Sequence, residues 1–169
     1  MIRRRQVLLG LTVFPLGCGA VSFDVDVPVP DQRVPGNIVG GLLPAFLPTP
    51  FALNVDVKAE TAKRNTGPAT SANIKSIAFQ STPHAAPSGT FDFVDAIHIF
   101  VEAGSLPKKE VASLEPVPKG RSSIDLSIVK DVDILPYVSA GATLTATATG
   151  RQPSKDFTFD GVVKITVHV

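Results

Sequence analysis

Hydrophobic and polar residues alternate along most of this chain with a period of two. In the stretch FDVDVPV, residues 23–29, Phe23 and the valines fall on one face, while Asp24 and Asp26 fall on the other. The same alternation recurs in residues 51–60, 73–81, 91–103, 123–129, 142–149 and 157–169. One apolar and one polar face at this period is typical of a half-buried β-strand. The pattern therefore predicts a chain built almost entirely of strands.

The stretches between these strands are rich in glycine, proline and serine, as in TGPATS, TPHAAPSG and PVPKG. Such residues favour turns and end strands. Strands with one solvated face belong to antiparallel sheets, and the apolar faces of two sheets must cover each other. We expect an all-β fold, an antiparallel two-sheet sandwich of about seven or eight strands with Greek-key connections. A closed barrel is the other common solution for such a pattern.

A few segments depart from the alternation. The best candidate for a helical turn is Ser105–Leu114, where a serine could cap the first turn and a proline follows early. A second short turn is expected within residues 129–140, since Pro136 would interrupt a strand there. The last two strands are expected to form a hairpin across residues 150–156. Asp95 interrupts an apolar face, and we expect it at a β-bulge that turns it to solvent. A hydrogen bond from its side chain to a turn is the alternative.

Composition fits one ordinary domain. The chain has 169 residues, of which 44% are hydrophobic and 18% charged. A chain of this size can bury a sufficient core without disulfides or metal, and its single cysteine cannot form an internal disulfide. The formal net charge is +1, with no tryptophan and one tyrosine. Neither a basic surface nor a base-stacking platform is indicated, so we expect no nucleic-acid partner.

The first residues have the composition of an export signal. Arg3, Arg4 and Arg5 precede the apolar run QVLLGLTVFPLG, residues 6–17. As a helix this run would span roughly 18 Å, against about 30 Å for the hydrocarbon core of a bilayer, so it is too short to cross a membrane well. A basic start, a short apolar run and small residues at its end are typical of a secretory signal, exported by either the general or the twin-arginine route. A buried N-terminal helix is the alternative.

The residues PLGC, Pro15 to Cys18, resemble the lipobox of bacterial lipoproteins. Gly17 and Cys18 match that motif, Leu16 is compatible with it, and Pro15 stands where the family usually has leucine. The resemblance implies cleavage before Cys18, a covalent diacylglycerol on its thiol, and an acyl chain such as palmitate on the new amino terminus. It divides the chain into a signal peptide (1–17), a lipidated tether (18–21) and a β-sandwich domain (22–169). A buried free cysteine is the alternative.

Anchoring would then depend on lipid rather than on charge. Loss of the three leader arginines leaves 13 basic and 15 acidic residues, a formal charge of −2. Such a surface has no electrostatic attraction to anionic lipid. Gly19 follows the cysteine, where the enterobacterial lipoproteins that this leader resembles carry aspartate when they stay in the inner membrane. We therefore expect a protein of the bacterial cell envelope, anchored more readily in the outer membrane and facing the periplasm or the exterior.

The most unusual stretch after the leader is VPGNIVGGLLPAFLPTP, residues 34–50, which has no charged residue. A long loop of this composition is often functional. Contact with the bilayer, an envelope protein or a hydrophobic ligand would use the large apolar residues Ile38, Leu42, Leu43, Phe46 and Leu47. A buried crossover that closes one end of the sandwich is the alternative.

Signals of catalysis or metal binding are weak. The pairs Asp24/Asp26 and Asp131/Asp133 could bind calcium, or could simply be solvated strand faces. The three histidines have no zinc-like spacing, so we expect no metal. Two Ser-x-x-Lys patterns begin at Ser105 and Ser127, and only the first could stack the two side chains on a helix. We expect no catalytic residues and no cofactor beyond the lipid on Cys18.

These observations favour a membrane-anchored envelope lipoprotein whose sandwich is a binding or structural module. A carrier of lipid or another hydrophobic ligand, using residues 34–50, is the first alternative. A hydrolase with residues scattered on loops is the second. A continuous apolar cavity would favour the carrier, and a cluster of Asp, His and Ser in one pocket would favour the hydrolase.

Overall fold

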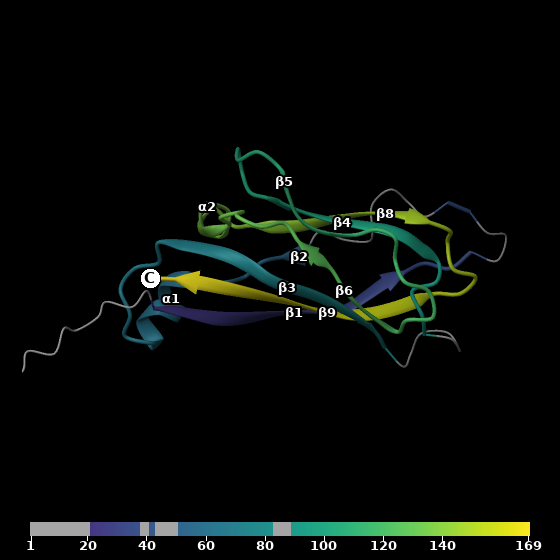
Figure 1. The fold of residues 1–169 in the computed structure, drawn as a ribbon, viewed down its shortest axis with the longest axis horizontal. Coiled ribbons are helices and arrows are strands. Elements are labelled where there is room, and N and C mark those ends of the chain that lie inside the picture. The colour runs from purple at the N-terminus through teal and green to yellow at the C-terminus, as the bar shows by residue number, and fades with distance from the viewer. Residues whose placement is uncertain (1–20, 38–40, 43–50, 83–88) are drawn as a thin grey trace, which may run out of the picture.

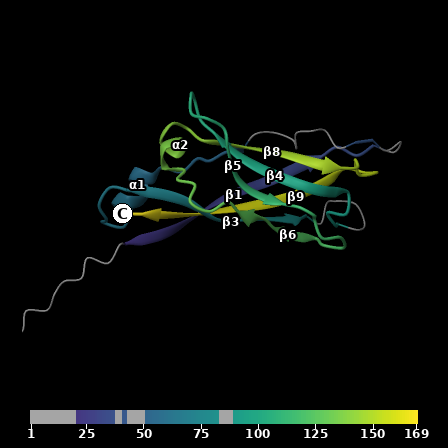
Figure 2. The same ribbon diagram turned by 45° about the horizontal axis from the view of Figure 1, so that its top comes forward.

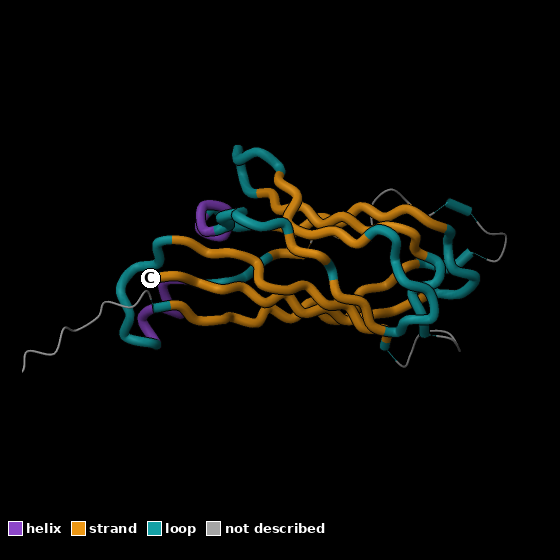
Figure 3. Tube along the Cα trace, in the orientation of Figure 1, coloured by secondary structure: helices purple, strands orange, loops and turns teal. Residues whose placement is uncertain are grey.

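Two antiparallel sheets pack face to face in a computed structural model that describes residues 21–37, 41–42, 51–82 and 89–169 (Figures 1 and 3). In spatial order, the first sheet consists of β1 (Ser22–Val34), β9 (Phe157–His168), β3 (Ser71–Ser81) and β6 (Ser123–Asp125). The second consists of β2 (Phe51–Ala52), β8 (Thr143–Gly150), β4 (Val94–Glu102), β5 (Lys109–Leu114) and β7 (Ser127–Ile128). The antiparallel two-sheet sandwich expected from the alternation is confirmed.

The core is the layer where the two inner faces meet. Along β9 the burial alternates strictly, so that Val163 and Ile165 are fully buried while Val162 is exposed. The facing sheet contributes Ile99 and Leu144, both with no exposed surface. Full burial of such a side chain contributes about 1.5–3 kcal/mol. Period-two burial on both sheets is therefore what holds them together.

An aromatic cluster fills one half of this core. Phe91 is 2% exposed, and its ring lies 5.0 Å from that of Phe157 and 5.9 Å from that of Phe159, edge to face in both cases. Phe93 contacts Phe157 at 4.8 Å, and Phe79 contacts Phe159 at 5.2 Å. The cluster joins β3, β9 and the turn that leads into β4, so it ties the two sheets together at the end where β9 begins.

Most connections pass from one sheet to the other. The strands β8 and β9 lie in different sheets, so the hairpin expected across residues 150–156 is wrong. Gly150 has a φ of +142°, and a side chain there would collide with the backbone of Phe93 and Val94. Beyond it, the amide of Gln152 donates to the carbonyl of Gly41 at 2.8 Å. The chain therefore bonds to the connection that follows β1 instead of folding back on β8.

The expected strand 51–60 is also wrong beyond its first two residues, because helix α1 (Val57–Lys63) replaces it. The Asp56 carboxylate accepts a hydrogen bond from the amide of Ala59 at 2.9 Å and caps the helix. Glu60 in the first turn and Lys63 in the last suit the helix dipole. The cap therefore favours a helix over a strand here, although the hydrophobic and polar residues alternate as they do in the strands of this protein.

The helical turn expected at Ser105–Leu114 is wrong as well. Residues 109–114 form β5, which pairs with β4. The short turn expected within 129–140 is confirmed as α2 (Leu135–Ser139), with Pro136 in its first turn. The expected strand 123–129 consists of two short strands, β6 and β7. The amide of Leu126 between them donates to the carbonyl of Ile77 in β3, and the chain then crosses from the first sheet to the second. This split, together with β5, explains nine strands in the described chain.

Two local features of the strands follow from the sequence. The register of β4 on β8 shifts between Val94 and Ala96, so the expected bulge at Asp95 is confirmed, and Asp95 is exposed. On β1, the carbonyl of Val21 accepts from the amide of Val169, so odd-numbered residues bond toward β9. This alternation places Pro28 on the outward side, and Pro30 lies where the register shifts between Val29 and Gln32. Both prolines lack an amide donor on an edge strand that could otherwise pair with another chain.

Candidate functional site

The sandwich has two dissimilar ends (Figure 2). The helical end carries Val21, α1, α2 and Val169, the last residue of the chain. The loop end carries the end of β1 and the connection from β8 to β9. β1 runs the full length between them, and its 13 residues at about 3.3 Å each place the ends roughly 40 Å apart. The two ends therefore present different residues, and each is described separately as a candidate binding surface.

A pocket with a volume of about 320 Å³ opens at the loop end. Its floor is aromatic, from Phe93 and Phe157, whose rings belong to the core cluster. Its rim is polar and comes from two segments some 60 residues apart in the sequence. The lining residues are Thr90, Asp92, Phe93, Gln152, Pro153, Ser154, Lys155 and Phe157.

Asp92 is the fixed anion of this pocket. Its carboxylate accepts hydrogen bonds from the amide of Gly120 and, at 3.0 Å, from the hydroxyl of Thr90. The amide of Gly120 is the main reason that the pKa of Asp92 lies below its usual value, and Thr90 lowers it further. Both donors hold the carboxylate in one orientation. Asp92 is therefore an ionised acceptor at neutral pH, suited to hydrogen-bond donors on a ligand.

The opposite wall of the pocket is held by a second carboxylate. Asp156 accepts from the amide of Gly36 at 2.8 Å and pairs with the guanidinium of Arg33. These contacts, the Gly36 amide first, hold the pKa of Asp156 below its usual range. The amide of Asn37 also donates to the carbonyl of Pro153 at 2.7 Å. We call these contacts between residues 33–37 and 152–156 the clasp, because they position one rim of the pocket.

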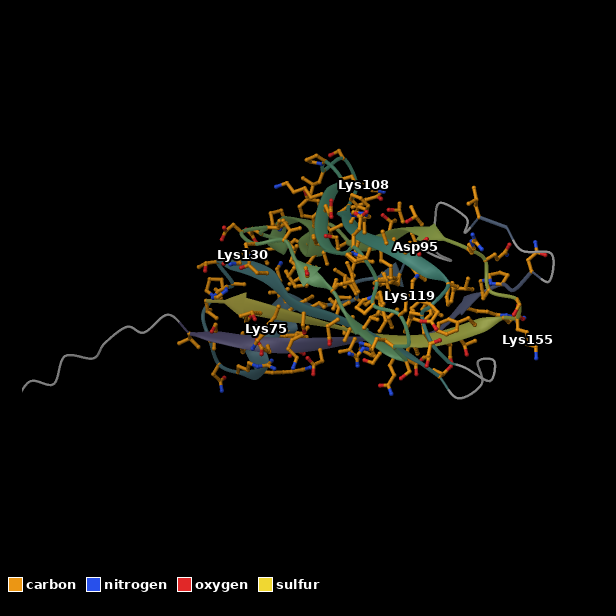
Figure 4. The ribbon with its side chains drawn as sticks, turned by 45° about the vertical axis from the view of Figure 1, so that its right-hand side comes forward. Lys75, Asp95, Lys108, Lys119, Lys130 and Lys155 are labelled. Atoms are coloured by element: carbon orange, nitrogen blue, oxygen red, sulfur yellow. The ribbon has the colours of Figure 1, made fainter. Side chains whose placement is uncertain are left out.

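Lys119 positions the other rim. Its ammonium group donates to the carbonyls of Asp92 and Val94 at 3.0 and 2.9 Å, and to the carboxylate of Asp95 at 2.8 Å. In Figure 4 Lys119 and Asp95 lie toward the end of the molecule that Lys155 marks. The bulge at Asp95 thus serves a structural purpose, since it presents a carboxylate to the lysine that secures the turn before β4.

The lining of the pocket combines charged, polar and aromatic groups. The described residues that line it include no histidine and no cysteine. Lys155 lies at the tip of the loop end (Figure 4) and forms no ion pair with any residue that the structure describes. A ligand here would meet an anion, a cation, an amide and an aromatic floor. Sequence reasoning missed this site, because no local motif links residues 90–93 to residues 152–157.

Of the residues predicted for contact with membrane or ligand, only Leu42 lies within the described chain. Its side chain is 86% exposed, and its backbone bridges to Arg151 at the loop end. Ile38, Leu43, Phe46 and Leu47 lie outside the described residues, as does Cys18. The structure thus places one large apolar side chain in solvent, next to the connection that forms the pocket rim.

The weaker candidates from the sequence have structural roles. Asp24 accepts from Lys75 at 2.6 Å and from Thr166 at 2.7 Å, and Asp133 accepts from the amides of Ala72 and Leu135, both at 3.0 Å. No group of three metal-binding side chains is found in the part of the chain that the structure describes.

His98 lies half-buried on β4, with Nδ1 3.0 Å from the carboxylate of Glu110. Residues 105–108 do not form the helix that Ser-x-x-Lys chemistry requires, and Lys108 instead contacts Glu102 at 2.6 Å.

No protein-family model matches this chain, and no curated protein matches its sequence. Within the described residues, neither helix has the length and hydrophobicity needed to cross a bilayer.

Proposed function

We propose that the protein is a lipid-anchored lipoprotein of the bacterial cell envelope whose sandwich is a binding or structural module without catalysis. Cleavage before Cys18 and a diacylglycerol on that residue would provide the anchor, more readily in the outer membrane. The leader and its lipobox-like residues support this proposal. So does the start of β1 at Ser22, which leaves only a very short tether between Cys18 and the folded domain.

The observation that carries the proposal is the opposition of the two ends. Val21 leaves the sandwich at the helical end, whereas the pocket and Leu42 lie at the loop end, about 40 Å away along β1. An anchor on Cys18 would hold the helical end against the bilayer. The loop end would then face away from the membrane, where a polar pocket can meet an envelope protein or another polar ligand.

A carrier of hydrophobic ligand is the second candidate, and the exposure of Leu42 favours it. Leu42 is 86% exposed and lies in the uncharged stretch 34–50, so it is available to contact a hydrophobic ligand. Replacement of Leu42 by aspartate separates the two candidates, because an exposed side chain should not affect the fold. Loss of a co-purifying lipid or other apolar molecule would favour the carrier, and an unchanged protein would favour the polar pocket.

The anchor is tested by a Cys18→Ser variant expressed beside the unaltered protein. We expect the unaltered protein in the membrane fraction, released by detergent but not by high salt. We expect the serine variant, which can accept no thioether-linked lipid, to lose the detergent-dependent anchoring. Detergent-dependent membrane attachment of the serine variant at the wild-type level, with residues 1–17 removed, would refute lipidation as the anchor.

The role of the loop end is tested by photo-crosslinking in whole cells. A photoreactive residue replaces Lys155 at the loop end or, as the matched control, Lys130 at the opposite end (Figure 4). Both lysines are exposed and neither forms an ion pair with a described residue. We expect a discrete crosslinked envelope partner from position 155 and only lipid from position 130. The same protein partner at both positions, or at 130 alone, would contradict the proposal.

A further inference from the structure

A groove between the two helices lies at the helical end. α1 and α2 face each other across two depressions of about 370 and 350 Å³, which share Val57, Lys58 and Ser139. The larger depression is mostly apolar and is also lined by Thr61, Pro68, Ala69 and Leu135. The smaller one adds Val55, Asp56 and Val138. We call the two together the interhelical groove.

The walls of this groove are fixed by local contacts. The hydroxyl of Thr61 donates to the carbonyl of Lys58 at 3.0 Å, so its polar atom is already satisfied inside the helix. Ile134, which is fully buried, and Asp133, which accepts from the amide of Leu135, hold the start of α2. The larger depression is therefore a preformed and mostly apolar surface, in which the hydroxyl of Thr61 is already hydrogen-bonded.

The chain enters the sandwich beside this groove. The amide of Val169 donates to the carbonyl of Val21 at 2.9 Å, and the space above Gly67 is bounded by the side chain of Val169. Gly67 directly precedes Pro68 and Ala69, which form one wall of the groove. The guanidinium of Arg64, which follows α1, lies 4.2 Å from the ring centre of Phe23. Val21 is thus a near neighbour of the groove wall.

We propose that the interhelical groove shelters an acyl chain of the lipid on Cys18 of the same molecule when the protein is out of the bilayer. The inference rests on the proposed lipidation. Cys18 is three residues from Val21, so its α-carbon lies within about 11 Å of that of Val21. A tether this short holds the lipid at an effective concentration in the millimolar range, so a modest intrinsic affinity is enough.

The groove has the composition that this occupant needs. Its apolar walls match methylene groups, and Lys58 can cover them with its stem while its ammonium group stays in water. A lipoprotein with exposed acyl chains would self-associate in water, and shelter for one of its three chains would reduce this tendency during transfer between membranes.

The test uses the lipidated full-length protein, transferred from detergent to aqueous buffer, with its acyl mass verified. A photoreactive benzoylphenylalanine replaces Leu135 in the groove or, as the control, Val162, which is 44% exposed on β9 and does not line the groove. We expect irradiation to join the peptide that contains position 135 to the lipidated Cys18 peptide of the same molecule, and to give no such product from position 162.

A second measurement does not depend on the photoreactive residue. Ala69→Phe narrows the groove, and we expect the lipidated variant to leave phospholipid vesicles about tenfold more slowly, because shelter of as few as two methylene groups is worth that factor. The inference would be overturned if position 135 crosslinked only to added phospholipid or to a second copy of the protein. It would also be overturned if Ala69→Phe left the rate of release unchanged. Either result would leave the proposed lipid anchor on Cys18 unaffected. Protein without acyl mass would overturn both.

Discussion

The clasp at the loop end makes a specific prediction for Gly36. A methyl group added at this position would lie 2.6 Å from the amide nitrogen of Asp156 and closer still to the backbone of Lys155. Real side chains do not tolerate such distances to a backbone, so the two segments must separate. The substitution Gly36→Ala is therefore expected to open the clasp and displace residues 152–156, which form one rim of the pocket.

The size of the effect follows from the bonds that would break. Gly36 donates to Asp156 at 2.8 Å, Asn37 to Pro153 at 2.7 Å, and the Gln152 side chain to the carbonyl of Pro35 at 3.0 Å. Each bond contributes about 0.5–1.5 kcal/mol, so the three together contribute about 1.5–4.5 kcal/mol to local stability. These bonds lie at the surface, away from the core, so the loss should appear as local opening rather than as global unfolding.

Amide hydrogen exchange measures this opening directly. In Gly36→Ala, the amides of Asn37 and Gln152 should exchange about ten to a thousand times faster, since each 1.4 kcal/mol is tenfold. The matched control is Gly67→Ala at the helical end, where the added methyl would make an ordinary contact of 3.7 Å with Val169. Unchanged exchange in Gly36→Ala, or equal acceleration at the loop end in Gly67→Ala, would refute the reasoning.

Three further predictions concern stability and assembly. Phe91→Ala removes a ring that is 2% exposed at the centre of the aromatic cluster, and urea unfolding should show a loss of about 3–5 kcal/mol. Replacement of both Pro28 and Pro30 by threonine restores donors on the outer edge of β1, so sedimentation should show greater self-association. The pKa values of Asp24 and Asp156 are lowered in the folded protein, chiefly by Lys75 and by the Gly36 amide respectively. Folded carboxylates of this kind bind fewer protons than unfolded ones, so stability should be retained above about pH 4 and fall below it.

Each of these has a clear contrary result. A loss below about 1 kcal/mol for Phe91→Ala would mean that the cluster does not join the sheets. If the variant that lacks both Pro28 and Pro30 stays monomeric, these prolines are not what protects the edge of β1 from pairing with another chain. Stability that is constant or rises as the pH falls from about 5 to 2 would contradict the inferred proton linkage of the surface carboxylates.

The fold could be predicted because its strands obey one physical rule. In β1, β8 and β9 the polar face meets water and the apolar face meets the other sheet, so alternation alone defines them. The same rule failed at residues 51–60, where Asp56 caps a helix. Alternation over so few residues does not distinguish a short helix from a strand. The rule failed again at residues 109–114, because pairing with β4 is a tertiary contact that overrides local helical preference.

The pocket at the loop end could not be predicted for a related reason. Asp92 and Lys155 are brought to opposite sides of one pocket only by the sandwich, through the aromatic cluster and the crossover after Gly150. Neither residue lies in a motif, and their chemistry is common to any protein surface. Asp95 shows the opposite case, because a charged residue on an apolar face is a local signal and its bulge was predicted from it.

The central claim is that a lipid on Cys18 holds the helical end at a membrane, and the intact mass of the protein extracted from the cell envelope tests it most directly. The account predicts a chain that has lost residues 1–17, begins at Cys18, and carries a diacylglyceryl group on sulfur with a further acyl chain on the amino terminus. A protein recovered from the soluble fraction with a free thiol at Cys18 would contradict it.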